Sequence, residues 1–334
     1  MKKVVCATLG NHWHWCAEEF PKYEWHFYNS IPKNRLEHTI RSPNLAMIRQ
    51  AKQVAITCRD PAVCLVITHD PRVTFWSASF MPKKRVIPQV AWSFNYELQP
   101  SGLKYRLMRR AFQKINRFVV HSTHEKQDYA KYFDLDPDKI DVLLWGIRTP
   151  EIEPVNRPLI KGDYICAIGG NNRDYKTLIL ALWKLWKEIP EIRLEMVVRP
   201  QNLKGLVLPP NVRTHVNIPF SQAMNILYYS RFMVLPLLGS KIANGHVTIV
   251  AAQHLGKAIL STRALGISDY IFPGQNSEVF PAFNVEALTE SIARLWHEPE
   301  KCQILGQNGQ TFASKNLTED NVKTHLRQVI SAYC

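Results

Sequence analysis

The sequence has no apolar run long enough to cross a membrane. A membrane-spanning helix needs roughly 18 consecutive apolar residues, and no stretch of this 334-residue chain approaches that length. The first residues, MKKVVCATLGNHWHW, become polar too early for the apolar core of a secretory signal peptide. These absences, together with 46% hydrophobic residues, indicate a globular protein and predict a cytoplasmic location.

Cysteine pairs with metal-binding or redox spacing are also missing. The seven cysteines are an odd number, include no CxxC pair and lie mostly in apolar stretches that look like strands or helices. They are Cys6, Cys16, Cys58, Cys64, Cys166, Cys302 and Cys334. We therefore expect reduced thiols, and neither a disulfide nor a thiolate metal site. Clustered His and Asp residues with metal-ligand spacing are lacking as well, so we expect no bound metal.

Acidic residues are scarce relative to basic ones. The formal net charge is +14, and residues 1–150 hold 23 Lys and Arg against 13 Asp and Glu, a net +10 that leaves +4 for the rest. The N-terminal half is therefore expected to face something anionic. Nucleic acid, an acidic phospholipid surface, and an acceptor with acidic or pyrophosphate groups all fit this bias.

Short apolar runs alternate with longer helical stretches along the whole chain, a pattern typical of parallel sheets crossed by helices. The strands expected in a first set are Val4–Leu9, Cys64–His69, Val86–Phe94, Arg117–Ser122 and Ile140–Gly146. Those in a second set are Tyr164–Gly170, Ile192–Val198, Val212–Ile218, Phe232–Leu237 and Ala258–Thr262, with helices such as Asp174–Glu188 and Ser221–Ser230 between them. The fold class is therefore α/β.

The chain length exceeds one typical core, so two domains are expected. Residues 148–162 carry three prolines and no periodicity, and we interpret them as a linker between domains at 1–147 and 163–316. Residues 317–334 are expected to form a last helix that returns to the N-terminal domain.

The stretch GHVTIVAAQHLGKAILST, Gly245–Thr262, predicts a helix that opens on Gly245, ends at Gly256 and leads into a buried strand. A helix N-terminus of this kind presents unpaired backbone N–H groups to an anion.

Three stretches in this order resemble the GT-B glycosyltransferases, and most closely the retaining family-4 type. They are RFVVHSTHEKQDYAKYFDLDPDKIDVLLWGI (Arg117–Ile147), GGNNRDYKTLILAL (Gly169–Leu182) and GHVTIVAAQHLGKAILSTRALGISDYIFPGQNSEVFPAFNVEALTESIARLW (Gly245–Trp296). The resemblance implies two Rossmann-like domains facing across a cleft. It also implies hexosyl transfer from a nucleotide sugar to a hydroxyl, with retention. The lack of a DxD motif predicts transfer without a metal. No cofactor is expected, since the nucleotide sugar is the donor substrate.

The chain departs from the family at two positions of its paired-Glu motif. Ala251 and Ala243 stand where the resemblance places the two Glu residues, one of which holds the donor ribose. A carboxylate suits ribose because it accepts hydrogen bonds from two adjacent hydroxyls, and alanine accepts none. Three explanations are open: the chain binds its donor in another way, it uses an unusual donor, or it has lost the transfer activity.

Donor-binding candidates follow strands of the second set. Arg173 precedes a helix, where a guanidinium could fork onto a pyrophosphate, and by resemblance it takes the place of the family's phosphate-binding Lys; a surface ion pair with Asp174 is the alternative. Arg199 and Lys204 follow the strand Ile192–Val198, where doubly wound sheets bind ligands; a solvated loop charge is the alternative for each. The turn Asn244, Gly245, His246, Val247 and Thr248 would approach the donor sugar and its distal phosphate; an ordinary helix start is the alternative.

Acceptor-side candidates come from the first set. Gly10, Asn11 and His12 follow the first strand, and nearby Trp13 or Trp15 could stack a sugar, although buried structural aromatics fit equally. His69 and Asp70 end an apolar strand and either face the cleft or cap the next helix. The family's active-site His is missing from VAWSFNYE, where Ser93, Asn95 and Glu97 are available instead. Glu97 would serve as a base if the chemistry were inverting.

Residues Ser101–Arg117 predict an amphipathic basic helix with Leu103, Leu107, Ala111 and Ile115 in one stripe. We expect the stripe to pack on the sheet, with peripheral contact to an anionic membrane as the alternative. The acceptor itself stays open between a saccharide, a lipid-linked sugar and a small molecule. A non-catalytic GT-B scaffold or partner subunit is the rival function. Nucleic-acid binding is not expected because the usual motifs are missing.

Overall fold

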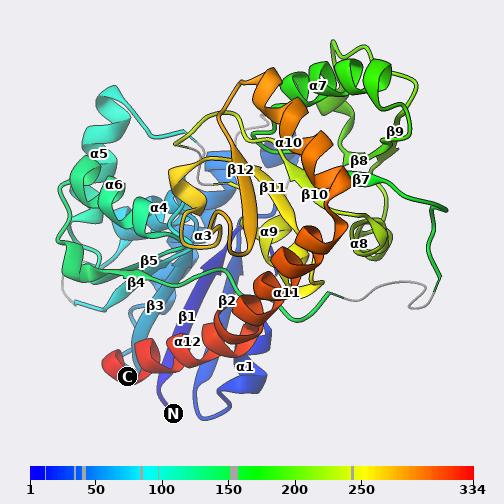
Figure 1. The fold of residues 1–334 in the computed structure, drawn as a ribbon. Helices are drawn as coiled ribbons and strands as arrows, with labels where there is room; N and C mark the ends of the chain where they lie inside the picture. Colours follow the sequence, from blue (N-terminus) through cyan, green and yellow to red (C-terminus); the bar gives the residue numbers. More distant parts are fainter. Residues whose placement is uncertain are drawn as a thin grey trace. The chain divides into compact units, whose positions relative to one another are not determined.

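The computed structural model describes residues 1–11, 13–33, 35–39, 43–82, 86–96, 98–150, 157–241 and 244–334. The chain divides into two compact units (Figure 1). Unit 1 comprises Met1–Leu143 and Thr324–Cys334, and unit 2 comprises Leu144–Lys323. Within the described ranges, no helix is long and apolar enough to span a membrane.

Unit 1 is built on a parallel six-stranded sheet in the order β2-β1-β3-β4-β5-β6. Its strands are β1 Lys3–Thr8, β2 Glu24–Asn29, β3 Val63–His69, β4 Gln89–Trp92, β5 Arg117–Val120 and β6 Ile140–Val142. Its helices are α1 Trp15–Glu19, α2 Arg35–Thr39, α3 Pro43–Thr57, α4 Pro71–Phe80, α5 Gly102–Phe112, α6 Thr123–Phe133, the 3-10 turn η1 Pro137–Lys139 and the second half of α12 Glu319–Tyr333. Phe94, Phe112, Phe118 and Phe133 form the centre of the core beneath α5 and α6.

Unit 2 repeats this architecture with the strand order β12-β11-β10-β7-β8-β9. Its strands, all parallel, are β7 Ile165–Ile168, β8 Leu194–Val198, β9 Val212–Val216, β10 Met233–Leu235, β11 Ile259–Thr262 and β12 Ser277–Phe280. Its helices are α7 Tyr175–Glu188, α8 Phe220–Tyr229, α9 His246–His254, α10 Val285–His297 and α11 Pro299–Asn316, with 3-10 turns η2 Pro200–Leu203 and η3 Leu265–Ile267.

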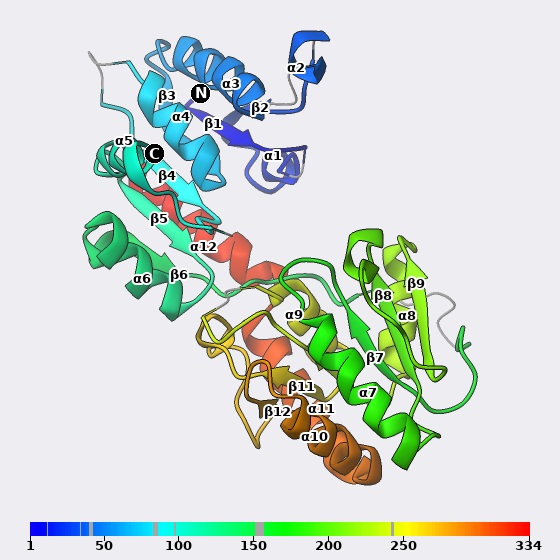
Figure 2. The same cartoon turned by 90° about the horizontal axis from the view of Figure 1, so that it is seen from above.

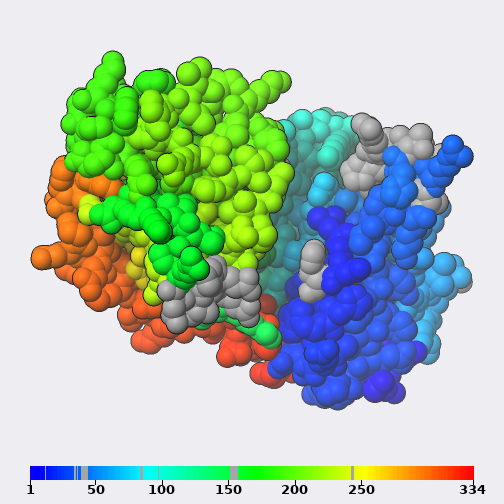
Figure 3. Space-filling model, turned by 90° about the vertical axis from the view of Figure 1, so that its right-hand side faces the viewer, coloured from blue at the N-terminus to red at the C-terminus, as the bar shows by residue number. Residues whose placement is uncertain are grey.

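Both faces of the unit 2 sheet are covered. On β7, Ile165 and Ala167 pack with α7 and α10, whereas Cys166 and Ile168 pack with α8, α9 and α11 (Figure 2). Helix α10, orange in Figure 3, adjoins the green α7 although the two are far apart in sequence. This double burial explains why the strands are continuous apolar runs in the sequence.

Of the twelve strands among the described residues, ten coincide with expected ones; the two that were not expected, β2 and β12, are the outermost strands on one side of each sheet. Strand β2, EWHFYN, is only half-buried throughout, and β12, SEVF, is half-buried at its two central residues. Neither therefore shows the apolar run that buried central strands require.

The expectation that all seven cysteines are reduced is wrong for two of them. Cys64 on β3 and the C-terminal Cys334 form a disulfide, with their Cα atoms 5.4 Å apart. Helix α12 brings them together: His325 lies 3.3 Å from Asp141 on β6, and the helix then runs across unit 1 toward β3. The sequence separation of 270 positions between the two cysteines hides this proximity from the sequence.

The expected stripe on the basic helix is only partly buried. Helix α5 ends at Phe112, earlier than expected, and buries Met108, Ala111 and Phe112. Leu103 and Leu107 are 72% and 50% exposed. Packing on the sheet therefore accounts for only the C-terminal end of the helix.

Candidate functional site

The donor-side residues lie where the chain reverses direction in the unit 2 sheet. After β7 the chain builds β8 and β9 on one side, then returns to place β10 on the other side of β7. In open parallel sheets, ligands bind outside the carboxyl ends of the strands at such a reversal. Arg173 follows β7 and forms a β-bridge with Leu237, which follows β10. It therefore spans the reversal point.

The guanidinium of Arg173 is half-buried and close to backbone. Its Nη1 donates to the Asn171 carbonyl over 2.8 Å. Its Nε is buried and has no hydrogen-bond partner among the described residues. A Cβ on Gly169 would lie 2.7 Å from Nη2, so glycine is needed there for the guanidinium to fit. Burial lowers the pKa of Arg173.

The alternative of a surface ion pair with Asp174 is wrong. The Asp174 carboxylate caps α7 by accepting from the Thr177 N–H over 3.1 Å. No ion pair joins Arg173 to any carboxylate in the part of the chain that the structure describes. A partly dehydrated cation without an anion is costly, so this position is suited to an anionic ligand.

The N-terminus of α9 adjoins Arg173. Gly245 caps the helix at φ 104° without a side-chain cap, and a Cβ there would lie 3.3 Å from Leu235 and 3.6 Å from Arg173 Nη2. The N–H groups of His246, Val247 and Thr248 open the helix and have no intrahelical partner. Their partial positive charge adds to that of Arg173.

The side chains of this turn differ in exposure and in their hydrogen bonds. His246 is buried, its Nε2 donates to the Gly266 carbonyl over 3.0 Å, and burial lowers its pKa to about 4, so the ring is neutral. Thr248 is buried, Val247 is 45% exposed and Asn244 is half-buried. Direct contacts of these side chains with a donor stay predictions.

Arg199 extends the same edge. It follows β8, its Nη1 donates to Asn171 Oδ1 over 3.3 Å, and a Cβ on Gly170 would lie 3.0 Å from its Cδ. Lys204 ends η2 and is exposed; no hydrogen bond within the described ranges links it to Arg173 or Arg199. We call Arg173, Arg199, Asn171 and the α9 N-terminus the donor-side cluster.

The structure describes one of the two alanines that stand at the family's paired-Glu positions. Ala251 is fully buried in the apolar cluster between α8, α9 and the sheet. Ala243 lies outside the described residues. The identification of these positions with the family's Glu residues stays a prediction.

The acceptor-side candidates lie at the matching reversal of the unit 1 sheet, between β1 and β3. Asn11 Oδ1 accepts from Asn29 Nδ2 over 2.7 Å, and Gly10 accepts from the Thr8 hydroxyl through its carbonyl. His12 and Glu97 lie outside the described residues.

Asp70 caps α4. Its carboxylate accepts from the Arg72 N–H over 2.7 Å and is paired with the Arg72 guanidinium. His69 lies 5.6 Å from Trp13, ring centre to ring centre, and Trp13 is buried as a structural aromatic. Of the two alternatives for Asp70, the structure shows the cap; catalytic roles for His69 and Asp70 stay predictions.

Sequence reasoning named Ser93 but missed the polar cluster that it forms with His121 and Glu125 at the carboxyl ends of β4 and β5. Ser93 Oγ and His121 Nε2 are 2.8 Å apart, and Glu125 Oε2 accepts from the His121 backbone N–H over 2.9 Å. We call Ser93, His121 and Glu125 the Ser93 cluster. The only sequence signal is the spacing Ser122-x-x-Glu125, a helix-capping pattern that α6 uses.

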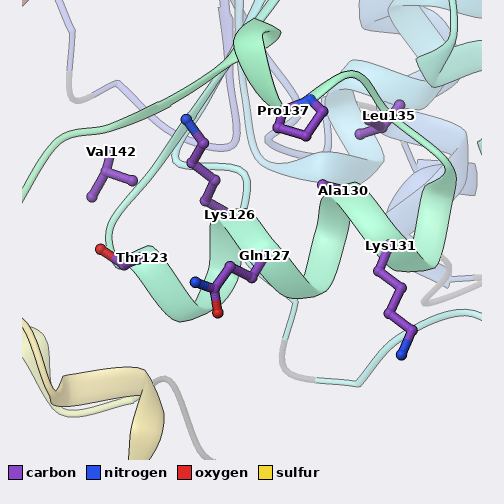
Figure 4. Close-up of a pocket in the computed structure, with 8 residues that line it drawn as sticks. All are labelled: Thr123, Lys126, Gln127, Ala130, Lys131, Leu135, Pro137 and Val142. Carbon is purple, nitrogen blue, oxygen red and sulfur yellow. The ribbon is translucent and has the colours of Figure 1, made fainter.

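A hollow of about 680 Å³ lies between α6 and the segment that leads into β6 (Figure 4). Polar Thr123, Lys126, Gln127 and Lys131 line it together with apolar Ala130, Leu135, Pro137 and Val142. None of the predicted site residues is among them. Three acidic residues alternate in the sequence beside this hollow: Asp134, Asp136 and Asp138. Two of them have other roles, since Asp136 caps η1 and Asp134 pairs with Arg109. The described residues contain no His, Cys, Asp or Glu group arranged to hold a metal.

The comparisons with known proteins agree with this architecture. Residues 167–312, which include the core of the donor-side cluster, match the family model of glycosyl transferases group 1. The sequence matches no curated protein. Among solved structures, the chain is similar to sucrose-phosphate synthase from Thermosynechococcus elongatus, with 12% identity over 99% of both chains and a TM-score of 0.75.

Two further structures show the same likeness. Anabaena Alr3699/HepE, solved with UDP-glucose, has 13% identity over 99% of this chain and 100% of its own, with a TM-score of 0.74. A glycosyltransferase from Rickettsia africae ESF-5 has 16% identity over 99% and 98%, with a TM-score of 0.72. The chain therefore has the GT-B fold of two Rossmann-like domains, and its second unit resembles glycosyl transferases group 1.

Proposed function

We propose that this protein is a glycosyltransferase that moves a sugar from a nucleotide-sugar donor to an acceptor hydroxyl. The observation that carries the proposal is Arg173, a half-buried cation without a carboxylate partner among the described residues, placed at the sheet reversal beside the N-terminus of α9. The family match over residues 167–312 supports the same activity.

The donor-side cluster fits a diphosphate. Arg173 would donate to one phosphate, Arg199 to the other, and the first N–H groups of α9 would approach the distal phosphate and the sugar. UDP-sugars are the first donors to test, because HepE was solved with UDP-glucose. Hexosyl transfer is part of the proposal.

We further propose transfer with retention and without a metal. In the transition state, negative charge grows on the leaving diphosphate, and the two arginines with the helix N-terminus would stabilise it. The departing phosphate can accept the acceptor's proton, so retention demands no protein base. His69, Asp70, Glu97 and the Gly10–His12 loop stay predictions for the acceptor side.

The acceptor stays open between a saccharide, a lipid-linked sugar and a small molecule. Peripheral contact with an anionic membrane is part of the proposal, and the exposed Leu103 and Leu107 among the basic residues of α5 support it. A cytoplasmic location stays a prediction. The Cys64–Cys334 bond argues against it, because disulfides persist mainly in oxidising compartments.

The rival function is a non-catalytic GT-B scaffold or partner subunit. Its support is the fully buried Ala251 at a position where a ribose-binding carboxylate is expected. The rival predicts that sugar nucleotides do not bind.

Thermal stabilisation across a panel of nucleoside diphosphates and UDP-, GDP- and ADP-sugars distinguishes the two, because a ligand that binds only the folded state raises the melting temperature. The transferase proposal predicts a selective shift that Arg173→Ala abolishes. No shift with any member of the panel would favour the scaffold.

A further inference from the structure

The Ser93 cluster is a hydrogen-bonded group of side chains at the carboxyl ends of β4 and β5 in unit 1. Strands β4 and β5 are parallel neighbours, with Ala91 opposite Phe118, so Ser93 and His121 emerge side by side at their carboxyl ends. Ser93 is half-buried, and His121 beneath it is 5% exposed. The serine hydroxyl is therefore the part of the cluster that an incoming molecule can reach.

With a neutral His121 ring, the hydrogen bonds set the direction of the Ser93 hydroxyl. His121 Nδ1 lies 2.9 Å from the Leu143 carbonyl, and a carbonyl only accepts, so Nδ1 carries the ring hydrogen. In the neutral ring Nε2 is then an acceptor, and the Ser93 O–H donates to it over 2.8 Å. The lone pairs of Ser93 Oγ are left to accept from a donor outside the cluster.

The surroundings hold this arrangement in place. Glu125 is buried and accepts from the His121 N–H, the Ser122 hydroxyl and the Asn95 amide. Ser93 has a φ of 47°, a left-handed conformation that is unfavourable for a residue other than glycine. A strained serine that is kept at the carboxyl end of a strand indicates a use for its side chain.

The geometry does not suit a nucleophilic role for Ser93. A serine nucleophile needs backbone N–H groups that stabilise the developing oxyanion. The N–H of Phe94 donates to the Val119 carbonyl, and the N–H of Asn95 donates to the Ser93 carbonyl. Both neighbouring donors are therefore occupied, and a non-covalent hydrogen bond is what the oxygen can offer.

We propose that Ser93 binds the acceptor by accepting a hydrogen bond from one of its hydroxyl groups, and that His121 is the positioning residue that keeps the Ser93 hydrogen turned away. This inference rests on the proposed function. It predicts acceptors with at least two hydroxyls, one to react and one to bind Ser93, as in a sugar or a glycoside.

Ser93→Gly is the informative variant, because glycine removes the hydroxyl and also relieves the positive φ. Kinetics would be measured as UDP release from UDP-sugars with methyl glycosides as surrogate acceptors. We expect an unchanged or higher melting temperature, an unchanged dissociation constant for UDP, and a KM for the glycoside raised about tenfold or more. Asp134→Gly is the matched control, since it relieves a φ of 54° in the same unit and should leave the kinetics unchanged.

Substitutions of His121 test the positioning role. His121→Gln keeps a carbonyl oxygen that can accept from Ser93 and should retain part of the acceptor affinity, whereas His121→Leu should behave like Ser93→Gly. Glycoside kinetics of Ser93→Gly within twofold of the wild type, with UDP binding intact, would overturn the role of Ser93. Failure of the wild type to bind UDP would instead contradict the proposed function.

Discussion

At the scale of single residues, strained backbone marks the carboxyl ends of strands in both sheets. Asp70, Ser93, Asn172 and Asn217 have positive φ values between 47° and 89°, and they follow β3, β4, β7 and β9. Conformations of this kind cost free energy and persist mainly where function or capping compensates them. Asp70 compensates by capping α4. Ser93 belongs to the Ser93 cluster, Asn172 precedes Arg173, and Asn217 donates its backbone N–H to the carbonyl of Val198, which precedes Arg199.

The sequence predicted Arg173 and offered Ser93 in place of the family's active-site His, but it did not predict that Ser93 pairs with His121, for a physical reason. Arg173 stands next to its own strand and helix, so local order alone locates it at a helix N-terminus. Ser93 and His121 are 28 positions apart and become a pair only because β4 and β5 are neighbours. Contacts that depend on strand order cannot be derived from spacing.

Glu125 should make stability depend on pH. Burial raises its pKa to about 7, above the ordinary value, so the native state keeps a proton that the unfolded chain loses. This proton adds at most about 3 kcal/mol to the free energy of unfolding. The contribution is complete below about pH 4.5 and is lost as the pH rises through 7. Chemical denaturation at several pH values between 4.5 and 8 measures it.

Glu125→Gln should reduce this slope, because the amide does not titrate. His246 titrates with the opposite sign: its lowered pKa removes stability as pH falls from about 6.5 toward 4. His246 therefore has little influence above pH 6.5, where the comparison is clearest. Equal slopes for Glu125→Gln and the wild type between pH 6.5 and 8 would refute the assignment.

At the scale of elements, the predictions succeeded where one strand or helix carries its own pattern. The helix start at Gly245 and the left-handed Gly256 at φ 66° follow directly from the residues. Strand β2 was missed because it is half-buried at all six positions, and β12, SEVF, because its two central residues are half-buried; neither forms an apolar run. The burial of α5 was overestimated because its amphipathic stripe does not reveal how much of the helix the sheet covers.

Helix α5 should bind anionic membranes. Leu103 and Leu107 are exposed beside Lys104, Arg106 and Arg110, which combines apolar insertion with charge attraction. Each basic residue near an anionic surface contributes about 1 kcal/mol. Arg106→Glu with Arg110→Glu should therefore weaken binding to phosphatidylserine-containing vesicles at least tenfold in a co-sedimentation assay.

The matched control makes the same charge change on α7 of unit 2, Lys176→Glu with Lys187→Glu, both exposed. This control should bind vesicles nearly as well as the wild type. Equal loss in both double variants would show that net charge, and no particular surface, governs binding. Absence of wild-type binding would contradict the membrane proposal.

At the scale of the whole molecule, the repeated α/β pattern predicted two sets of parallel strands crossed by helices, and the family resemblance implied that they form two Rossmann-like domains. The alternation of apolar strands and helices is a property of the entire chain, and it survives the errors at individual elements. The disulfide was not predicted, because it joins β3 to the end of the chain and depends on the path of α12.

Reduction of the Cys64–Cys334 disulfide should lower stability. A cross-link between distant residues restricts the unfolded chain, and removing one costs typically about 2–5 kcal/mol. The melting temperature of the wild type should therefore fall in dithiothreitol. Cys334→Ser should melt at the lower temperature with or without the reductant. A wild-type melting temperature that does not respond to dithiothreitol would contradict the disulfide.

The central claim is that Arg173 binds the diphosphate of the donor, and calorimetric titration with UDP tests it most directly. Arg173→Met should weaken UDP binding about 10- to 100-fold, since hydrogen bonds to charged groups contribute about 1.5–3 kcal/mol. Its melting temperature without ligand should not fall, because the variant removes a cation that has no carboxylate partner within the described residues. Arg213→Met, on the exposed part of β9, should bind UDP like the wild type. Equal UDP affinity in Arg173→Met and the wild type would contradict the account.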